Sequence, residues 1–165
     1  MELTQKYLKI FLDYNPLTGD FIWKKEKRGV TVGKTAGSKS NGYVQIGITI
    51  NNLRKVYAAH RLAWLYFYGY LPENQIDHID NNKSNNSISN LRICSQRENN
   101  YNVSKKKDNT SGYKGVSYRN CNKKYRATIR VLGKNKHLGY FSTAKEASLK
   151  YQEKAKELHK EFYRD

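Results

Sequence analysis

The chain has 165 residues, a formal net charge of +17 and only two cysteines. This length suffices for one ordinary domain or a few small modules, and it excludes a large multidomain enzyme. Such an excess of lysine and arginine indicates a polyanionic partner, with nucleic acid as the first candidate. Charge alone leaves open a ribosomal-type or simply very soluble basic protein.

The cysteines and the hydropathy pattern indicate the cellular compartment in which the protein acts. Cys94 and Cys121 lie far apart and neither belongs to a C-x-x-C pair, which argues against a disulfide framework and against a cysteine-based zinc site. No run approaches the ~18 apolar residues of a membrane span, and the N-terminal segment does not read as a signal peptide. We therefore expect a cytoplasmic protein that acts without a membrane.

The positive charge is unevenly distributed along the chain. Residues 1–59 carry a net charge of +6, residues 60–102 are neutral, and residues 103–165 carry +11. A neutral, Asn-rich centre between basic flanks is expected where the flanks contact phosphates and the centre does something else, such as binding a cation.

The N-terminal segment predicts one helix followed by strands. Aromatic and β-branched residues predict strands over residues 21–25, 43–50 and 53–59, with Asn51 and Asn52 placed for a tight hairpin turn. Residues 26–42 are expected to form a basic loop. The opening helix, which the turn-forming residues 15–19 end, is predicted from apolar residues at helical spacing: Leu3, Tyr7, Ile10, Phe11 and Tyr14.

The central segment predicts a helix, a hairpin and a second helix. Residues 60–72 form an apolar helical pattern that Gly69 and Pro72 can terminate. Strands are predicted over residues 75–79 and 91–95, joined by a loop dense in turn-forming residues. Ser95 followed by Glu98 is a capping-box pattern, which predicts a helix with Asn99 in its early turns.

The C-terminal segment has a different pattern. After a polar stretch that begins at residue 103, strands are predicted over residues 113–119, 125–131 and 136–141. Thr143 and Glu146 form a second capping box. The helix that follows is predicted from an apolar stripe: Ala144, Ala147, Tyr151, Ala155, Leu158 and Phe162.

Asp77 and His78, at the end of a predicted strand, carry the first chemical signal. Hydrolysis of a phosphodiester needs a nucleophilic water, a base and a cation that offsets developing charge. An aspartate oxygen suits Mg²⁺, and a neutral imidazole accepts a proton near physiological pH. An Asp-His pair alone is mostly accidental. The prediction depends on its order with Asn90, twelve residues after His78, and Asn99, nine residues further.

This order resembles the HNH endonucleases of phage introns and free-standing phage homing genes, in the branch whose last motif position is Asn. The resemblance covers about residues 15–102 and implies a ββα-metal motif over about residues 73–102. It implies that Asp77 and Asn99 bind the metal, that His78 is the general base, and that Asn90 ties the loop together and helps to orient the histidine. One divalent cation per active site is implied; amide oxygen favours Mg²⁺ or Mn²⁺ over Zn²⁺, and we expect Mg²⁺.

Neighbouring residues match the same branch. Arg61 is expected to brace the scissile phosphate by charge-assisted hydrogen bonds. His60 is more simply a packing residue beside an apolar helix. Four further residues match positions that shape the loop and are not expected to bind metal: Asp80, Asn82, Asn85 and Asn86.

A second resemblance lies in residues 111–162. The matching residues are Gly115, Val116, Ala127, Ile129, Arg130, Leu138, Gly139, Phe141, Thr143, Ala144 and Ala147. They resemble the plant Apetala-type (ethylene-response-factor) DNA-binding domain, whose sheet enters the major groove while its helix packs behind. Because side chains alternate along a strand, Arg126, Thr128 and Arg130 share one face. Ser117 and His137 depart from the family pattern, so its base preferences are not carried over. The predicted DNA contacts are Lys114, Arg119, Lys124, Arg126, Thr128, Arg130 and His137.

The sequence thus predicts an α+β protein: a nuclease domain over residues 1–102 with a β-rich N-terminal region, a linker over 103–111, and a three-stranded antiparallel sheet packed on one helix over 112–165. The resemblance implies hydrolysis of double-stranded DNA, as a nick or a double-strand break, to 5′-phosphate and 3′-hydroxyl ends. We expect a phage-encoded protein that acts inside a bacterial host, as a monomer or a dimer, with no small-molecule cofactor. A non-catalytic DNA-binding regulator and an RNA-binding protein or ribonuclease remain alternatives.

Overall fold

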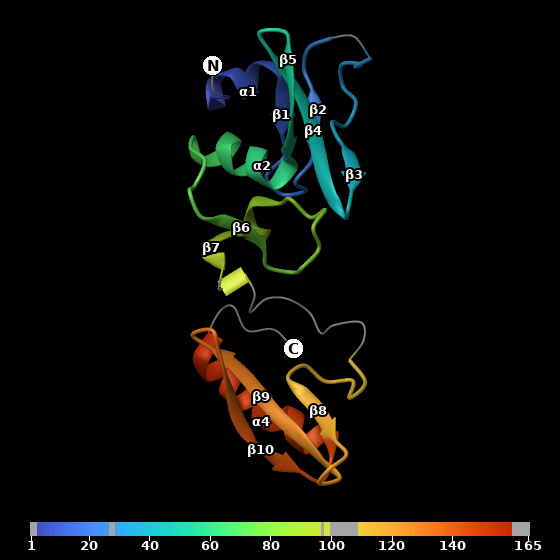
Figure 1. Ribbon diagram of the computed structural model, residues 1–165. Helices are drawn as coiled ribbons and strands as arrows, with labels where there is room; N and C mark the ends of the chain where they lie inside the picture. Colours follow the sequence, from blue (N-terminus) through green and yellow to red (C-terminus); the bar gives the residue numbers. More distant parts are fainter. Residues whose placement is uncertain (1–2, 27–28, 97, 100–108, 160–165) are drawn as a thin grey trace. The chain divides into compact units, whose positions relative to one another are not determined.

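The computed structural model describes residues 3–26, 29–96, 98–99 and 109–159 (Figure 1). The chain divides into two compact units, Met1–Gln96 and Arg97–Asp165. Both combine helices with small antiparallel sheets, which confirms the predicted α+β class. The predicted domain boundary and most of the predicted linker lie outside the described residues. No helix in the described ranges is long and apolar enough to cross a membrane.

The first unit opens with helix α1, Gln5–Phe11, which begins where the Thr4 hydroxyl accepts a hydrogen bond from the backbone N–H of Tyr7. The prediction of helix as far as Tyr14 was wrong in its last turn. Leu12–Tyr14 forms strand β1, which pairs antiparallel with β2, Phe21–Trp23. Pairing with β2 buries alternate residues of β1 in the core, which the helical spacing of the preceding residues did not reveal.

Three strands form the main sheet of this unit, in the order β3, β4, β5. Strands β4, Tyr43–Ile50, and β5, Leu53–Ala58, were predicted, as was the hairpin turn, whose two Asn residues have φ of +50° and +62°. Positive φ at both central residues matches the twist of a tight hairpin. Strand β3, Ser38–Ser40, lies in the predicted loop. All of its side chains are exposed, so only backbone pairing with β4 defines it.

Helix α2, Ala59–Tyr68, packs against this sheet and against α1. It ends as predicted at Gly69, whose φ of +85° is the left-handed cap that glycine adopts readily. The apolar face of α2 joins the core residues of α1, β1, β2 and β4. Residues with almost no solvent exposure form the centre of that core: Leu8, Leu12, Phe21, Ile46, Ile48 and Leu62.

A two-stranded hairpin completes the first unit. Strands β6, Gln75–His78, and β7, Leu91–Cys94, pair antiparallel as predicted, and the loop between them ends in a short 3₁₀ turn, Ile88–Asn90. Residues 96, 98 and 99 are helical, so the helix starts directly after Ser95, at the place that the capping pattern indicates.

The second unit is a three-stranded sheet covered by one helix. Strands β8, Val116–Arg119, β9, Lys124–Val131, and β10, Lys134–Phe141, lie in the order β10, β9, β8, and α4, Ala144–His159, packs on one face. The predicted capping box is confirmed by reciprocal hydrogen bonds, Thr143 N–H to Glu146 and Glu146 N–H to Thr143. Phe162 of the predicted stripe lies outside the described residues.

Candidate active site

The β6–β7 hairpin carries two buried polar residues. Asp77 and His78 are 7% and 4% exposed, and burying such groups is costly unless each has a partner. Successive side chains on a strand point to opposite faces. The two residues accordingly have different partners, although they are adjacent in sequence.

Arg92 is the partner of Asp77. The two residues lie directly opposite each other in the β6–β7 register. Nη2 and Nε of Arg92 donate to Oδ2 of Asp77 at 2.9 and 3.1 Å. The buried carboxylate of Asp77 is therefore paired with the guanidinium of Arg92, through charge-assisted hydrogen bonds that are stronger than neutral ones.

The imidazole of His78 is held by the side chain of Asn86 and is predominantly neutral. Nε2 of His78 lies 3.2 Å from Oδ1 of Asn86. Because an amide oxygen only accepts, this pairing puts the proton on Nε2 and the lone pair on Nδ1. Burial lowers the pKa of His78, against the opposing effects of Asn86, Asp80 and Asp77. A neutral imidazole with an unprotonated Nδ1 is the form that a general base needs.

Asn86 is itself fixed by two further contacts. The Tyr14 hydroxyl donates to the backbone carbonyl of Asn86 at 2.7 Å, and the amide of Asn86 donates to the carbonyl of Ser84 at 3.2 Å. Asn86 was predicted only to shape the loop. Its direct contact with His78 was missed, because several Asn residues crowd this loop and their spacing does not distinguish them.

Asn90 lies at the centre of a hydrogen-bonded loop. Its amide nitrogen donates to Oδ1 of Asp80 at 2.9 Å and to the carbonyl of Asn85 at 2.8 Å, and its Oδ1 accepts from the N–H of Asp80 at 3.0 Å. The backbone carbonyl of Asn90 accepts from the N–H of Ile79, next to His78. Burial raises the pKa of Asp80, but hydrogen bonds from Asn85, Asn90 and Asn82 outweigh it, and the net shift is downward. These bonds fix the backbone on both sides of the loop.

Two aromatic rings pack beside His78. The ring of His60 meets it edge to face with centroids 5.1 Å apart, and Tyr43 lies 6.1 Å from His78. Nδ1 of His60 is buried and has no hydrogen-bond partner among the residues described. Burial lowers the pKa of His60 to about 4, with His78 and Arg61 adding to the shift. His60 therefore packs, as expected, and the residue it packs on is His78.

Two cations besides the predicted Arg61 lie near the site. Nη2 of Arg61 donates to the carbonyl of Pro72 at a long 3.4 Å. Nζ of Lys83, in the loop, lies 4.7 Å from the centroid of the Tyr43 ring, and its charge acts on His78. Lys83 and Arg92 were not singled out from the sequence. The predicted strands 75–79 and 91–95, paired end to end, place Ile93 opposite Asp77; the observed register is shifted by one residue and brings Arg92 there instead.

The donors available for a cation are oxygens. In the described parts of the chain, no cluster of three or more His, Cys, Asp or Glu residues is arranged to hold a metal. A cation beside Asp77 would depend on one carboxylate with amide, water and phosphate oxygens, which is the kind of ligand set that Mg²⁺ takes. Asn99, the second predicted ligand, is helical, partly buried, and belongs to the second unit.

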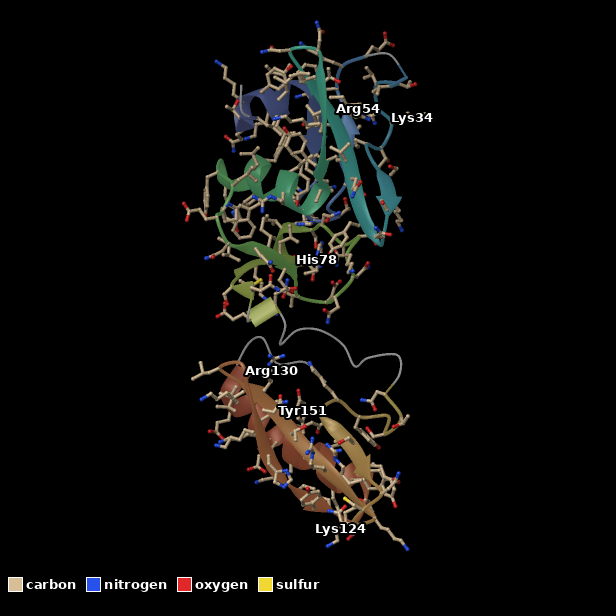
Figure 2. The ribbon with its side chains drawn as sticks, viewed as in Figure 1. Lys34, Arg54, His78, Lys124, Arg130 and Tyr151 are labelled. Atoms are coloured by element: carbon tan, nitrogen blue, oxygen red, sulfur yellow. The ribbon has the colours of Figure 1, made fainter. Side chains whose placement is uncertain are left out.

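The predicted DNA contacts of the second unit lie mostly on the face of the sheet away from α4. Ala127 and Ile129 are buried towards the helix, and Arg126, Thr128 and Arg130 alternate with them, as predicted. Figure 2 shows Lys124 and Arg130 at opposite ends of β9. The strand register places three more predicted residues on this outer face: Arg119, Lys124 and His137.

Four of these residues are partly buried or already hydrogen-bonded. Lys114 precedes β8, and burial lowers its pKa. Nε of Arg130 donates to the carbonyl of Gly133 at 3.2 Å. Nε of Arg119 and of Arg126 is buried with no hydrogen-bond partner within the described ranges.

Known proteins resemble the chain in both units. Protein 3.8 of Escherichia phage T7 is 33% identical over 106 residues, which cover 64% of this chain and 87% of that protein. The uncharacterized HNH endonuclease L560 of Acanthamoeba polyphaga mimivirus is 29% identical over 155 residues, covering 93% of this chain and 71% of that protein.

A solved structure and a family pattern give further matches. The structure of the HNH homing endonuclease I-HmuI, from a study of its DNA binding and cleavage, shares 30% identity over 56% of this chain and 51% of that one, with a TM-score of 0.44. The sequence pattern of the HNH endonuclease family matches residues 57–101, the segment that includes Asp77, His78, Asn90 and Asn99. Because residues 57–101 match the family pattern and the similarity to the phage T7 protein extends over 87% of that protein, the chain belongs to the HNH endonuclease family.

Proposed function

We propose that the protein is a metal-dependent endonuclease that hydrolyses phosphodiester bonds in double-stranded DNA, leaving 5′-phosphate and 3′-hydroxyl ends. One observation carries the proposal most directly. His78 is buried and predominantly neutral, and Asn86 binds its Nε2, in the segment that matches the HNH endonucleases. A histidine prepared in this way suits the removal of a proton from an attacking water.

His78 acts as the general base. With its proton on Nε2, the Nδ1 lone pair can accept a proton from water, and the bond to Asn86 keeps the ring in that orientation. His60 and Tyr43 pack beside the ring and restrict its rotation. Asn90 ties together the loop that presents Asn86.

Asp77 and Asn99 are the proposed metal ligands. When bound, a divalent cation offsets the negative charge that develops on the phosphate and on the leaving oxygen. The donors present, one carboxylate and one amide oxygen, fit Mg²⁺ or Mn²⁺. Arg92 fixes the carboxylate of Asp77 on β6 and keeps it oriented.

Cations of both units hold the substrate. Lys83 lies beside the ring of Tyr43, next to His78, and is the better placed candidate for a phosphate near the cut, because Arg61 is bound to a backbone carbonyl. Arg61 stays a proposed phosphate contact as well. The outer face of the β8–β10 sheet is the proposed grip on duplex DNA, which its basic side chains and its resemblance to the Apetala-type domain support.

A plasmid assay tests this function. Supercoiled DNA is incubated with wild type and His78→Ala in Mg²⁺, in Mn²⁺ and in EDTA, and the ends are mapped by ligation. We expect relaxed or linear, religatable DNA from wild type with metal, and none with EDTA or from His78→Ala. DNA binding without cleavage under every metal condition would instead support the non-catalytic regulator. Preference for RNA in a competition with duplex DNA would support the ribonuclease.

A further inference from the structure

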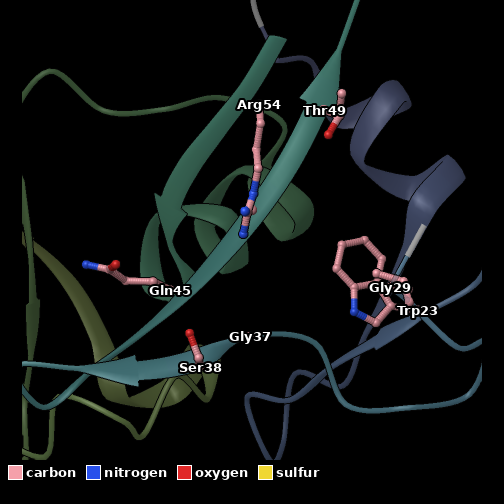
Figure 3. A pocket seen from close by; sticks show the side chains of 9 residues that line it. Trp23, Gly29, Gly37, Ser38, Gln45, Thr49 and Arg54 are labelled. Atoms are coloured by element: carbon pink, nitrogen blue, oxygen red, sulfur yellow. The ribbon is translucent and has the colours of Figure 1, made fainter. Parts of the chain in front are cut away.

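The first unit has a cavity on the face of the main sheet opposite its core (Figure 3). It measures about 560 Å³, within the ~300–1,000 Å³ range of small-ligand sites. Ile46 and Ile48 of β4 are buried in the core, whereas the alternating residues Gln45, Gly47 and Thr49 line the cavity. Trp23, Ser38 of β3 and Arg54 of β5 also line it. We call it the Arg54 cavity.

Gly47 makes room for the guanidinium of Arg54. Arg54 pairs in register with Thr49, and its side chain extends across β4 over Gly47. A Cβ on Gly47 would lie 2.7 Å from Nε and 2.9 Å from Nη2 of Arg54. The backbone of Gly47 is outside the left-handed region, so its conformation does not require glycine. Glycine matters at this position because the space that a side chain would fill is occupied by the guanidinium of Arg54.

The chemistry of the cavity favours an anion. Within the described residues, Arg54 has no hydrogen bond or ion pair, and no acidic residue lines the cavity. A guanidinium offers five N–H donors in a fork that matches phosphate oxygens. Ser38, Gln45 and Thr49 add polar side chains to the lining of the cavity. Lys34 lies on the loop whose backbone hydrogen-bonds to the backbone of Trp23 (Figure 2).

We propose that the Arg54 cavity binds one backbone phosphate of the DNA strand together with its sugar, several nucleotides from the cut. This inference rests on the proposed function. Tyr43, at the start of β4, lies 6.1 Å from His78 between ring centroids. Gly47 is four residues along β4, about 13 Å at the rise of a strand. Phosphates of one DNA strand advance by ~3.4 Å along the helix axis, so the spacing of about 13 Å between Tyr43, beside His78, and Gly47 corresponds to about four nucleotides.

Binding of a 30-base-pair duplex, measured by fluorescence anisotropy in EDTA over a salt series, tests the proposal. Arg54→Gln should weaken binding about tenfold and reduce the slope of log K against log salt by ~0.9, the value for one neutralised phosphate. Gly47→Ala should produce the same loss, because its Cβ displaces the guanidinium. Lys55→Gln is the matched control: it removes one charge from the next residue of β5, on the opposite face, and should change affinity less than threefold.

Each other outcome overturns the proposal. Equal losses for Arg54→Gln and Lys55→Gln would show unspecific attraction, and an unchanged affinity of Arg54→Gln would show that DNA does not occupy the cavity. Competition with inorganic phosphate at constant ionic strength adds a second readout. If phosphate displaces DNA from neither wild type nor Arg54→Gln, and Arg54→Gln binds DNA as tightly as wild type, the cavity binds no DNA phosphate. Binding is measured without metal and so does not depend on cleavage. If the variants show the expected losses of affinity but wild type never cuts plasmid, the proposed nuclease function is refuted and the proposed phosphate site stands.

Discussion

At the scale of single residues, the site depends on partners that compensate for burial. Asp77 is almost inaccessible, and Arg92 lies opposite it on the neighbouring strand. Removing one member of a buried pair is far more costly than removing both, because it leaves a charge without compensation. The Asp77–Arg92 pair therefore contributes to the folding of the site as well as to the orientation of a proposed ligand.

This pair gives a stability prediction. Arg92→Leu should lower the free energy of unfolding of the first unit by about 3–5 kcal/mol, the range for breaking a buried pair. The double variant Asp77→Leu, Arg92→Leu should recover a large part of that loss. Denaturant unfolding followed by tryptophan fluorescence reports on this unit, since both tryptophans, Trp23 and Trp64, belong to it. A double variant less stable than Arg92→Leu would contradict the explanation.

His60 gives a pH prediction. Its pKa falls from 6.5 in the unfolded chain to about 4 in the fold, so the unfolded state binds more protons between these values. Stability therefore decreases as the pH falls from about 6.5 to about 4, by about 3 kcal/mol in total from this group at 1.36 kcal/mol per pKa unit. Unfolding should be measured across this range for wild type and for His60→Phe, which keeps a ring against His78. Equal pH profiles for both proteins would contradict the prediction.

At the scale of elements, the residue patterns predicted most helices and strands, because each buries one face in a unit core. The sequence did not reveal β1 and β3. β1 follows a helix without a break in the apolar pattern, and β3 has no buried side chain. The motif positions Asp77, His78, Asn90 and Asn99 were identified from their order. Their partners Arg92, Asn86 and Lys83 were not, because those contacts depend on strand register and loop conformation.

The junction of β8, β9 and α4 gives a third prediction. Gly115 has φ of +73°, and a Cβ there would lie 2.2 Å from the ring of Tyr151. Gly115→Ala should therefore destabilise the second unit by the ~1–2 kcal/mol cost of left-handed backbone and by ~1–3 kcal/mol more for overpacking. Gly133, with φ of +80° and open space at its Cβ position, is the control. Thermal unfolding should show a clearly smaller loss for Gly133→Ala; equal losses would exclude the clash with Tyr151.

At the scale of the whole molecule, we propose that the sheet of the second unit adds a grip on DNA to that of the first unit, which carries the proposed general base. The first unit carries Asp77 and His78, and the second presents its basic sheet face. Tethering a second binding surface raises the effective concentration of DNA near the site without changing the chemistry.

This arrangement predicts separable defects. Replacing Arg126 and Arg130 by Gln should weaken duplex binding. The slope of log K against log salt should fall by up to ~0.9 for each phosphate that the variant no longer neutralises. The single-turnover cleavage rate at saturating protein should stay within about threefold of wild type, since neither residue belongs to the proposed catalytic group. A comparable loss in that rate would show that the sheet takes part in the chemistry.

The measurement that tests the central claim most directly compares cleavage with binding in His78→Ala. Loss of a general base typically slows a reaction by ~10²–10⁴. With Mg²⁺ and saturating protein, we predict that the variant cleaves duplex DNA at least ~10²-fold more slowly than wild type in single turnover, while its affinity for the duplex in EDTA changes less than threefold. Cleavage by His78→Ala within threefold of the wild-type rate would contradict the role of His78, and with it this account of the site.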